Sequence, residues 1–446
     1  MAAHLPRLAF LCLIGLLSAH HSPAQNPKAT YGTTALVNAT VFTITKGTVD
    51  HCTVIIRDGM IESVGPDIPV PGDAEVIDCE GLRIYPGMID GGTYLGLSEI
   101  GSDPRTQDYN EVGDVIPQMK ALTAVNPTSA LIPVTRVNGV TTVLAAPSGG
   151  LLSGTAALMN LQGYTPHQMH AGFEGIIMNF PSTTRKGTHD KRTDEEIRKA
   201  AEKGMKKLEE VWKKAKEYYL LDSAMIDKSP HYYPEMKALL PVLQGKMALM
   251  VEVNHAGDIL KALEWIEEKK IKKVILTGVE EGWRVADKIA AANIPVITGR
   301  VLTLPERTYD RYDRAYSNAG LMKKAGVKVA IRTNEANNVR NLPYNAGFAA
   351  AYGLGKEEAL RSITIVPAEI FGVDDRMGSI EDGKDANLFV CDGDPLEPRT
   401  NIRYLFIGGW QVPLVSRQTE LYEEFLHRQP GLQKSEPGAP LSIPAR

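Results

Sequence analysis

Two side chains suited to proton transfer, Glu252 and His255, stand three residues apart in the sequence. Glu252 lies near the end of Met247–Val253, a short and mostly apolar segment of the kind that forms buried strands. A carboxylate and an imidazole can serve as a general acid and a general base when both reach the same pocket. The alternative is a hydrogen-bonded pair that only lines a pocket.

The other histidines and serines give weaker indications of chemistry. His167 and His170 have the H-x-x-H spacing that would place them on one face of a helix, but a neighbouring proline favours a surface loop. Ser148 and Ser153 lie in a glycine-rich stretch without the G-x-S-x-G motif of a serine nucleophile, so we expect turn residues there. Three of the ten histidines fall near the N-terminus, namely His4, His20 and His21.

The composition is that of a large globular protein. The chain has 446 residues, of which 43% are hydrophobic and 23% are charged, so it can bury a sizeable core. Its 49 Lys and Arg residues are balanced by 53 Asp and Glu residues. Because proteins that grip nucleic acid usually carry a basic excess, we expect no nucleic-acid partner.

Residues 1–24 predict a signal peptide and therefore export to the periplasm or full secretion. Arg7 precedes the ten-residue apolar run Leu8–Leu17, and small residues before Gln25 offer a cleavage site. Neither this run nor any later segment is long enough for a membrane span. Export permits a disulfide, and the sequence leaves open one disulfide or three buried thiols among Cys52, Cys79 and Cys391.

The elements that must position these residues change in kind along the chain. Before residue 85 the pattern is one of short β segments, with a hairpin signal at Arg57-Asp58-Gly59-Met60, because Asp-Gly accepts the positive φ of a tight turn. The strands expected at the two ends of the chain are Ala35–Ile44, Cys52–Ile56, Ile61–Val64, Glu75–Asp78, Ala386–Val390 and Ile402–Ile407.

Between these ends, apolar β segments alternate with helical segments. We expect strands at Thr141–Ala145, Gly175–Met178, Met247–Val253, Val274–Leu276, Pro295–Thr298 and Val327–Ile331. We expect helices at Asp258–Lys269, Gly282–Ala292 and Ala315–Ala325, and a charged helix from a Thr193 cap to Tyr218. Repeated β-α units over this length predict an α/β fold and favour a (β/α)₈ barrel over an open sheet.

Three motifs carry a family resemblance: Ile84-Tyr85-Pro86-Gly87-Met88-Ile89-Asp90, then Pro147-Ser148-Gly149-Gly150 followed by Leu152-Ser153-Gly154, and finally Gly372–Leu388. The first resembles the entry into the first barrel strand of the amidohydrolase superfamily. The second resembles a loop after the second strand in the exported, imidazolonepropionase-like branch of that superfamily. The third resembles the return of the chain into the family's small β domain.

The resemblance implies a TIM-like (β/α)₈ barrel with a small β-sandwich domain formed by N- and C-terminal segments. The chain would then divide into a signal peptide (1–24), the first part of the sandwich (25–84), the barrel (85–379), the second part of the sandwich (380–415), and a helix with a loose tail (416–446). It also implies a hydrolase of carbon–nitrogen bonds, non-peptide or cyclic amides, that uses one or two divalent metals such as zinc. Such metals lower the pKa of a bound water at the C-terminal mouth of the barrel.

The positions where the resemblance implies metal ligands hold other residues in this chain. Gly92 and Tyr94 stand in place of an H-x-H pair after the first strand, and Glu252 stands at the ligand position of strand 5. Thr277 replaces the His of strand 6, and Asn334 replaces the Asp of strand 8. Glycine offers no donor, and neutral Thr and Asn are weak ligands, so we expect no metal site and no cofactor.

Two functions therefore stay open. The first is a pseudoenzyme, silent in the metal-hydroxide mechanism, that binds a small molecule, forms a homo-oligomer or pairs with an active homologue. The second is a divergent hydrolase in which Glu252 and His255 are catalytic. In both cases we expect the surrounding pocket to be lined by Tyr94, Thr277, Asn334 and Thr93.

Overall fold

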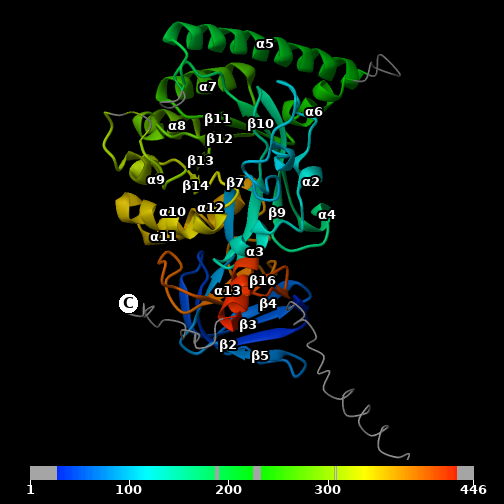
Figure 1. Ribbon diagram of the computed structural model, residues 1–446, viewed down its shortest axis with the longest axis vertical. Helices are drawn as coiled ribbons and strands as arrows, with labels where there is room; N and C mark the ends of the chain where they lie inside the picture. The colour runs from blue at the N-terminus through cyan, green and yellow to red at the C-terminus, as the bar shows by residue number, and fades with distance from the viewer. Residues whose placement is uncertain (1–27, 186–189, 225–232, 306, 308, 429–446) are drawn as a thin grey trace, which may run out of the picture.

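The computed structural model consists of an eight-stranded barrel and a separate small β domain, which lies at the bottom of Figure 1. It describes residues 28–185, 190–224, 233–305, 307 and 309–428. The expected signal peptide and the tail beyond residue 428 lie outside the described residues. None of the described helices is both long enough and apolar enough to cross a membrane.

The barrel sheet runs in chain order, with each strand bonded to the next. Its strands are β7 (Met88–Thr93), β8 (Val140–Ala145), β9 (Leu152–Asn160), β10 (His170–Asn179), β11 (Ala248–Val253), β12 (Val274–Gly278), β13 (Val296–Thr298) and β14 (Val329–Ile331). All neighbours pair in parallel except β9, which is antiparallel to both β8 and β10. The expected α/β barrel is confirmed, with one reversed strand.

The reversed strand corrects the expectation that Leu152-Ser153-Gly154 belongs to a loop, because these residues begin β9. Ser153 is not a free turn serine, since its hydroxyl donates to the Gly149 carbonyl at 2.6 Å. Gly154 is required by a close approach rather than by a turn. A Cβ at that position would lie 2.8 Å from the Met119 carbonyl oxygen.

Hydrogen bonds between the end of the first strand and the segment that follows the last strand bring the barrel close to closure. Backbone N–H groups of Asn334 and Tyr94 donate to the carbonyls of Gly92 and Glu335, each at 3.0 Å. The Asp90 carboxylate reinforces this seam by accepting bonds from the Thr333 amide and hydroxyl and from the Gly92 amide. The side chain of Asp90 is fully buried, so the seam contains an ionisable group away from water.

Helices surround the sheet, and one of them closes its lower end. The main helices are α7 (Ala256–Lys269), α8 (Ala286–Ala292), α9 (Arg314–Lys324), α10 (Leu342–Ala349), α11 (Lys356–Arg361) and α12 (Ile365–Phe371). Side chains of α12 form one apolar cluster with the inward-facing strand residues Ile89, Leu144, Met250, Ile275, Ile297 and Ala330. The interior is therefore a packed core, and only the opposite, C-terminal end of the strands is open to a ligand.

Shorter helices lie in the connections: η1 (Pro104–Thr106), α2 (Ala121–Ala124), α3 (Leu131–Arg136), α4 (Pro166–Met169), α6 (Pro234–Leu243), η2 (Gly282–Arg284), η3 (Val339–Asn341) and η4 (Ala350–Leu354). The single helix expected over Gly282–Ala292 is divided into η2 and α8. His167 and His170 also differ from the expected loop, because α4 contains the first and β10 begins with the second.

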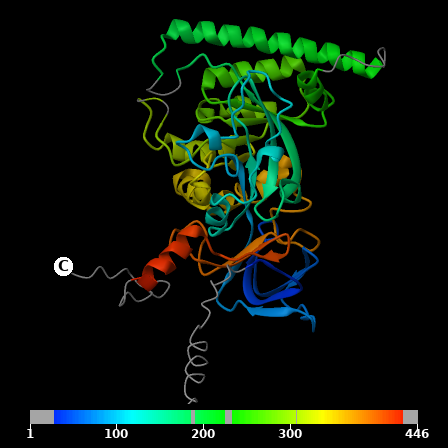
Figure 2. The ribbon, with the colours of Figure 1, turned by 45° about the vertical axis from the view of Figure 1, so that its right-hand side comes forward.

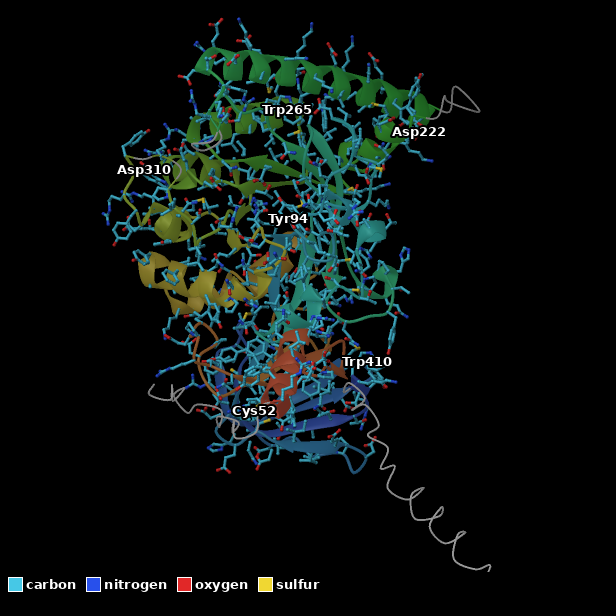
Figure 3. The ribbon with its side chains drawn as sticks, in the orientation of Figure 1. Cys52, Tyr94, Asp222, Trp265, Asp310 and Trp410 are labelled. Atoms are coloured by element: carbon cyan, nitrogen blue, oxygen red, sulfur yellow. The ribbon has the colours of Figure 1, made fainter. Side chains whose placement is uncertain are left out.

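The charged helix is α5 (Asp194–Ala224), which lies across the top of the barrel in Figure 1. Its first turn is held by a capping box, in which Thr193 and Glu196 exchange hydrogen bonds. Its inner face packs through the buried Trp212, which meets Trp265 of α7 edge-on at 5.2 Å between ring centroids. The charged face points away from the barrel (Figure 3), as the alternation of Lys and Glu predicts.

The small domain joins both ends of the chain in one branched sheet. Its strands are β1 (Thr30–Tyr31), β2 (Thr34–Phe42), β3 (Thr48–Arg57), β4 (Met60–Gly65), β5 (Glu75–Asp78), β6 (Arg83–Pro86), β15 (Leu388–Cys391), β16 (Ile402–Ile407) and β17 (Trp410–Gln411). The predicted hairpin is confirmed, with positive φ at Asp58 and Gly59. Helix α13 (Arg417–Arg428) then projects from this domain (Figure 2).

The three cysteines that follow the expected signal peptide, Cys52, Cys79 and Cys391, are buried free thiols in the small domain. Burial raises the pKa of the Cys79 and Cys391 thiols to about 12. These thiols therefore stay protonated and unreactive at neutral pH. Of the two alternatives left open by the sequence, the structure selects the buried thiols.

The buried Asp90 carboxyl predicts a pH dependence of stability. Burial raises its pKa to about 7, although bonds from Thr333 and Gly92 oppose the increase. The folded chain keeps this proton up to about pH 7, whereas an unfolded Asp releases it near pH 4. Through this group, the free energy of unfolding should fall by up to about 1.4 kcal/mol per pH unit between those values.

Asp90→Asn should remove this contribution, because an amide oxygen can accept from the Thr333 amide without titrating. We expect urea unfolding at pH 5 and pH 7 to show a smaller pH difference for Asp90→Asn than for the unaltered chain. Asp67→Asn, at an exposed turn position, serves as the control and should leave the difference unchanged. Equal pH differences in all three proteins would contradict the prediction.

Candidate functional site

A cavity of about 470 Å³ opens at the carboxyl ends of the barrel strands. Residues directly after the four strands β7, β10, β11 and β14 line it, and Tyr94 after β7 lies near the centre of the barrel in Figure 3. The full lining is Tyr94, Ser148, Gly149, Gly150, Asn179, Phe180, Ser182, Glu252, Val253, Asn254, His255, Asp258, Glu280, Arg332 and Asn334. In a barrel of this kind, the carboxyl end of the strands is where binding and chemistry occur.

An ion pair between Arg332 and Glu252 spans this cavity. Arg332 follows β14, and its Nη2 donates to Glu252 Oε1 at 2.8 Å. The hydroxyl of Thr277, on β12, donates to the other carboxylate oxygen at 2.7 Å. The Arg332 side chain is 8% exposed and that of Glu252 is 24% exposed, so the guanidinium is buried while the carboxylate keeps some access to the cavity.

The pair holds both groups in their charged forms. Burial alone would raise the pKa of Glu252, but the charge and hydrogen bond of Arg332, with bonds from Thr277 and Asn254, bring that pKa below its ordinary value. Burial would likewise lower the pKa of Arg332, and Glu252 outweighs this effect and raises it. Glu252 is therefore an ionised and well-satisfied acceptor, which makes it a weak base.

Two glycines make room for the ion pair. A Cβ at Gly92 would lie 3.1 Å from Cδ of Arg332, so a histidine at this position would need the space that the arginine side chain occupies. A Cβ at Gly278 would lie 2.7 Å from Oε1 of Glu252 and 2.0 Å from Oδ1 of Asn254. Gly278 also has a positive φ of 81°, which disfavours a side chain there.

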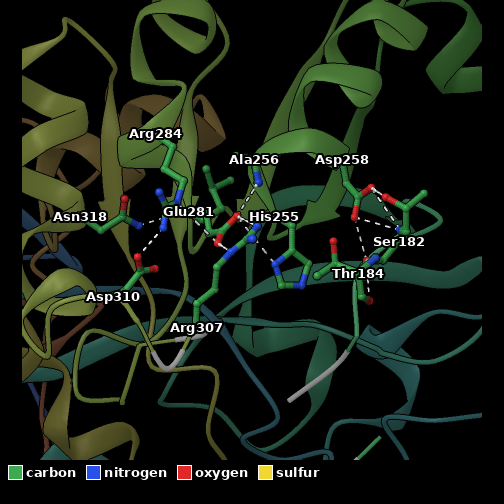
Figure 4. Close-up of polar contacts among 12 residues, drawn as sticks. Ser182, Thr184, His255, Ala256, Asp258, Glu281, Arg284, Arg307, Asp310 and Asn318 are labelled. Carbon is green, nitrogen blue, oxygen red and sulfur yellow. Dashed lines mark hydrogen bonds and ion pairs between the residues drawn. The ribbon is translucent and has the colours of Figure 1, made fainter. Parts of the chain in front are cut away.

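His255 belongs to a second cluster, which also includes Glu281 and Arg307 (Figure 4). It occupies the N-cap position of α7, and its Nδ1 faces the buried carboxylate of Glu281 at 3.9 Å. Glu281 also accepts from the Ala256 amide at 2.9 Å and forms a bidentate pair with Arg307. Burial would raise the pKa of Glu281, but the hydrogen bonds from Arg307 and Ala256 lower it overall.

Asp258 fixes the loop that follows β10 against the start of α7. Its buried carboxylate accepts from the Ser182 hydroxyl at 2.8 Å and from the amide and hydroxyl of Thr183. Figure 4 shows this contact beside the ring of His255. The first turn of α7 thus presents both His255 and Asp258 to the cavity.

The structure brings most of the predicted site residues together. Tyr94, Glu252, His255 and Asn334 line one cavity, and Thr277 touches it through its bond to Glu252. Thr93 is buried and accepts a bond from the Leu95 amide instead of lining the cavity. The catalytic roles predicted for Glu252 and His255 stay predictions. In the structure the two side chains face different charged groups, Arg332 and Glu281 respectively.

The sequence interpretation missed Arg332, the residue on which this arrangement depends. Its signal was a charged residue directly after an apolar strand, between Ile331 and Thr333. Sequence position alone does not show where its long side chain ends, because Glu252 is 80 residues away. Glu281 was missed for the same reason.

A second hollow, a groove of about 1600 Å³, lies at the opposite end of the barrel. It is lined by residues at the beginnings of strands, such as Ala248 and Val274, and by Phe371 of α12. Side chains at this end of a TIM-like barrel contribute to stability more often than to function. The mouth cavity is therefore the stronger candidate site.

The residues at the mouth do not fit the divalent metal that a metal-dependent barrel would hold. Within the described part of the chain, no three His, Cys, Asp or Glu side chains are grouped closely enough to hold a metal ion. The cationic guanidinium of Arg332 already contacts Glu252, the anionic residue at a predicted ligand position. A dication placed at that carboxylate would face a buried positive charge.

Comparison with known proteins identifies the family. The model of the amidohydrolase family matches residues 84–415, which is most of the chain. The chain belongs to the amidohydrolase family. The solved structure of an amidohydrolase from Thermotoga maritima MSB8 is similar to this chain with a TM-score of 0.74 and 26% identity, covering 86% of this chain and all of that one.

Two curated relatives support the same assignment over shorter spans. Amidohydrolase tasK of Hapsidospora irregularis is 23% identical over 383 residues, which are 77% of this amidohydrolase-family chain and 38% of the relative. The imidazolonepropionase of Thermoplasma volcanium is 28% identical over 150 residues, which are 32% of this chain and 33% of the relative. The chain thus spans little more than a third of the length of the curated relatives it matches.

The buried pair predicts a strong coupling between Arg332 and Glu252. Arg332→Met should lower the free energy of unfolding by about 3–5 kcal/mol, because it leaves a buried carboxylate without its partner. The double variant Arg332→Met/Glu252→Gln should cost clearly less than the sum of its single variants. Urea unfolding at pH 7 measures all three.

The exposed pair between Arg300 and Glu335 provides the matched control. These side chains are 49% and 30% exposed, with a contact of 2.7 Å. Arg300→Met should therefore cost less than about 1 kcal/mol. Additive effects of the Arg332 and Glu252 substitutions would show that the two charges are not coupled in solution.

Proposed function

We propose that this amidohydrolase-family protein binds a small molecule in its mouth cavity and does not hydrolyse it by the metal-hydroxide mechanism. The proposal rests chiefly on the Arg332–Glu252 ion pair. Three positions that would carry metal ligands are involved with this pair. Glu252 binds the guanidinium, Thr277 donates to the same carboxylate, and Gly92 leaves room for the arginine side chain. In this proposal, the guanidinium of Arg332 supplies the positive charge at the mouth in place of a metal ion.

The cavity itself supports a binding role. Its volume of about 470 Å³ falls in the range of small-molecule sites, and polar side chains converge on it from several strands. The barrel interior below it is filled, so a ligand would enter and leave through the mouth alone. Fold membership in a hydrolase family leaves this possibility open, because function belongs to the site and not to the fold.

The divergent hydrolase receives less support from the geometry. A general base must be free to accept a proton, whereas Glu252 has a lowered pKa and accepts from both Arg332 and Thr277. His255 faces Glu281 and not Glu252. We also propose that the mature protein is exported, from the predicted signal in residues 1–24, and that it pairs with an active homologue. These two points need tests of their own.

Metal content and hydrolysis test the proposed function together. The chain from Gln25 onward, purified without chelator, should contain well below one equivalent of zinc, manganese, iron or nickel by elemental analysis. It should also fail to hydrolyse a hydantoin, a lactam and a dipeptide, with or without added zinc. An imidazolonepropionase carried through the same purification and its own assay serves as the positive control.

The two contrary outcomes point to different mechanisms. One tightly held metal ion per chain, lost with Glu252→Gln, would show that the mouth is a metal site after all. Metal-free hydrolysis that disappears in Glu252→Gln and in His255→Gln would instead establish the divergent hydrolase. Either result would overturn the proposed function.

A further inference from the structure

We propose that the ligand of the mouth cavity is a small organic cation, an amine or amidine rich in hydrogen-bond donors. This inference rests on the proposed function and adds the chemical class of the ligand. It is argued from the charges that line the cavity, from the polar atoms there that lack partners, and from the aromatic ring at its edge.

The charges of the lining favour a cation. The cavity is lined by three carboxylates, those of Glu252, Asp258 and Glu280, and by one guanidinium, that of Arg332. Arg332 is already paired with Glu252, so its charge is neutralised locally. Asp258 accepts from the neutral Ser182 and Thr183, so its negative charge remains, and a cleft lined by one sign of charge concentrates ligands of the opposite sign.

Several acceptors of the lining remain available to a ligand that donates hydrogen bonds. Oδ1 of Asn254 is a buried acceptor without a partner among the described residues. The side-chain amide of Asn179 donates to the Gly149 and Gly150 carbonyls and to the Ser153 hydroxyl, so its oxygen remains as an acceptor. The carboxylate of Glu252, still partly exposed, adds further acceptor sites beside these amide oxygens.

Two buried side chains of the cavity have a polar atom that a ligand could bind. His255 and Arg332 both line it, with only 7% and 8% of their side chains exposed. Nδ1 of His255 and Nε of Arg332 have no hydrogen-bond partner in the described part of the chain. Buried polar atoms are rarely left unpaired in a folded protein, and those left unpaired are often found at functional sites.

The ring of Tyr94 adds a surface for a flat cation. It forms part of the lining and rests on Tyr109, with ring centroids 4.6 Å apart. A delocalised cation such as an amidinium can lie against the face of a tyrosine while its N–H groups reach carboxylates at its edge. The ring and the acceptors line the same cavity, from residues after β7 and β11.

Three flat probes of similar shape but different charge test the inference. They are benzamidinium, benzamide and benzoate, measured by isothermal titration calorimetry with the chain from Gln25 onward at constant ionic strength. Benzamidinium should bind at least about tenfold more tightly than benzamide, since it adds a charge attracted by the lining. Benzoate should show no binding at the same concentrations.

Glu252→Gln should reverse the preference, because it removes one carboxylate and leaves Arg332 unpaired. We expect at least about tenfold weaker binding of benzamidinium and measurable binding of benzoate. Glu369→Gln, which removes a carboxylate from the groove at the opposite end of the barrel, is the matched control. It should leave all three affinities unchanged.

A salt series keeps the test independent of any variant that fails to fold. Raising sodium chloride from about 20 to about 200 mM should weaken benzamidinium binding to the unaltered chain and leave benzamide binding unchanged. Equal affinities for benzamidinium and benzamide, a preference for benzoate, or no binding of any probe would overturn the inference. Those outcomes would not touch the proposed function, which the metal and hydrolysis measurements decide separately.

Discussion

Arg332 and Glu252 face each other across the barrel mouth at 2.8 Å, and the neighbouring residues are arranged around that contact. Removing two charges from water costs several kcal/mol per ion, so such a pair persists only with good geometry and further hydrogen bonds. Thr277 and Asn254 supply those bonds to the carboxylate. Glycines at 92 and 278 leave the space that the two side chains need. The identities of these neighbours therefore follow from the ion pair.

Under the proposed function, the same constraint allows the family scaffold to be kept while its chemistry changes. The strands, the filled interior and the small β domain match other amidohydrolases across most of the chain. None of those features depends on what stands at the ends of the strands. A buried guanidinium supplies one positive charge with fixed directions of donation, whereas a metal ion supplies two charges and exchangeable water. Under the proposed function, the mouth stays polar and preorganised without generating hydroxide.

Much of this arrangement could be predicted from the sequence, and the remainder depends on contacts that sequence spacing does not reveal. Apolar β segments located the strands of the barrel within a few residues, and motif positions brought Tyr94, Glu252 and Asn334 to one cavity. Strand β9 was missed altogether, because its beginning, Leu152-Ser153-Gly154, was interpreted as part of a loop, and its antiparallel direction leaves no mark in its composition. Arg332 was missed because its partner lies on another strand, and the end of a long side chain is fixed only when the barrel closes.

The seam between the first and last strands also sets an order in which the protein can fold. Asp90 and Thr333, which bond across it, are 243 residues apart, and the small domain pairs β6 with β15 from the far end of the chain. Contacts over such separations form late, because the entropy of closing a long loop must first be overcome. A chain growing from its N-terminus exposes the unpaired edge of β7 until Glu335 has been made. The mouth cavity therefore forms only after the chain has reached Glu335, and no N-terminal fragment that ends before Asn334 can contain its full lining.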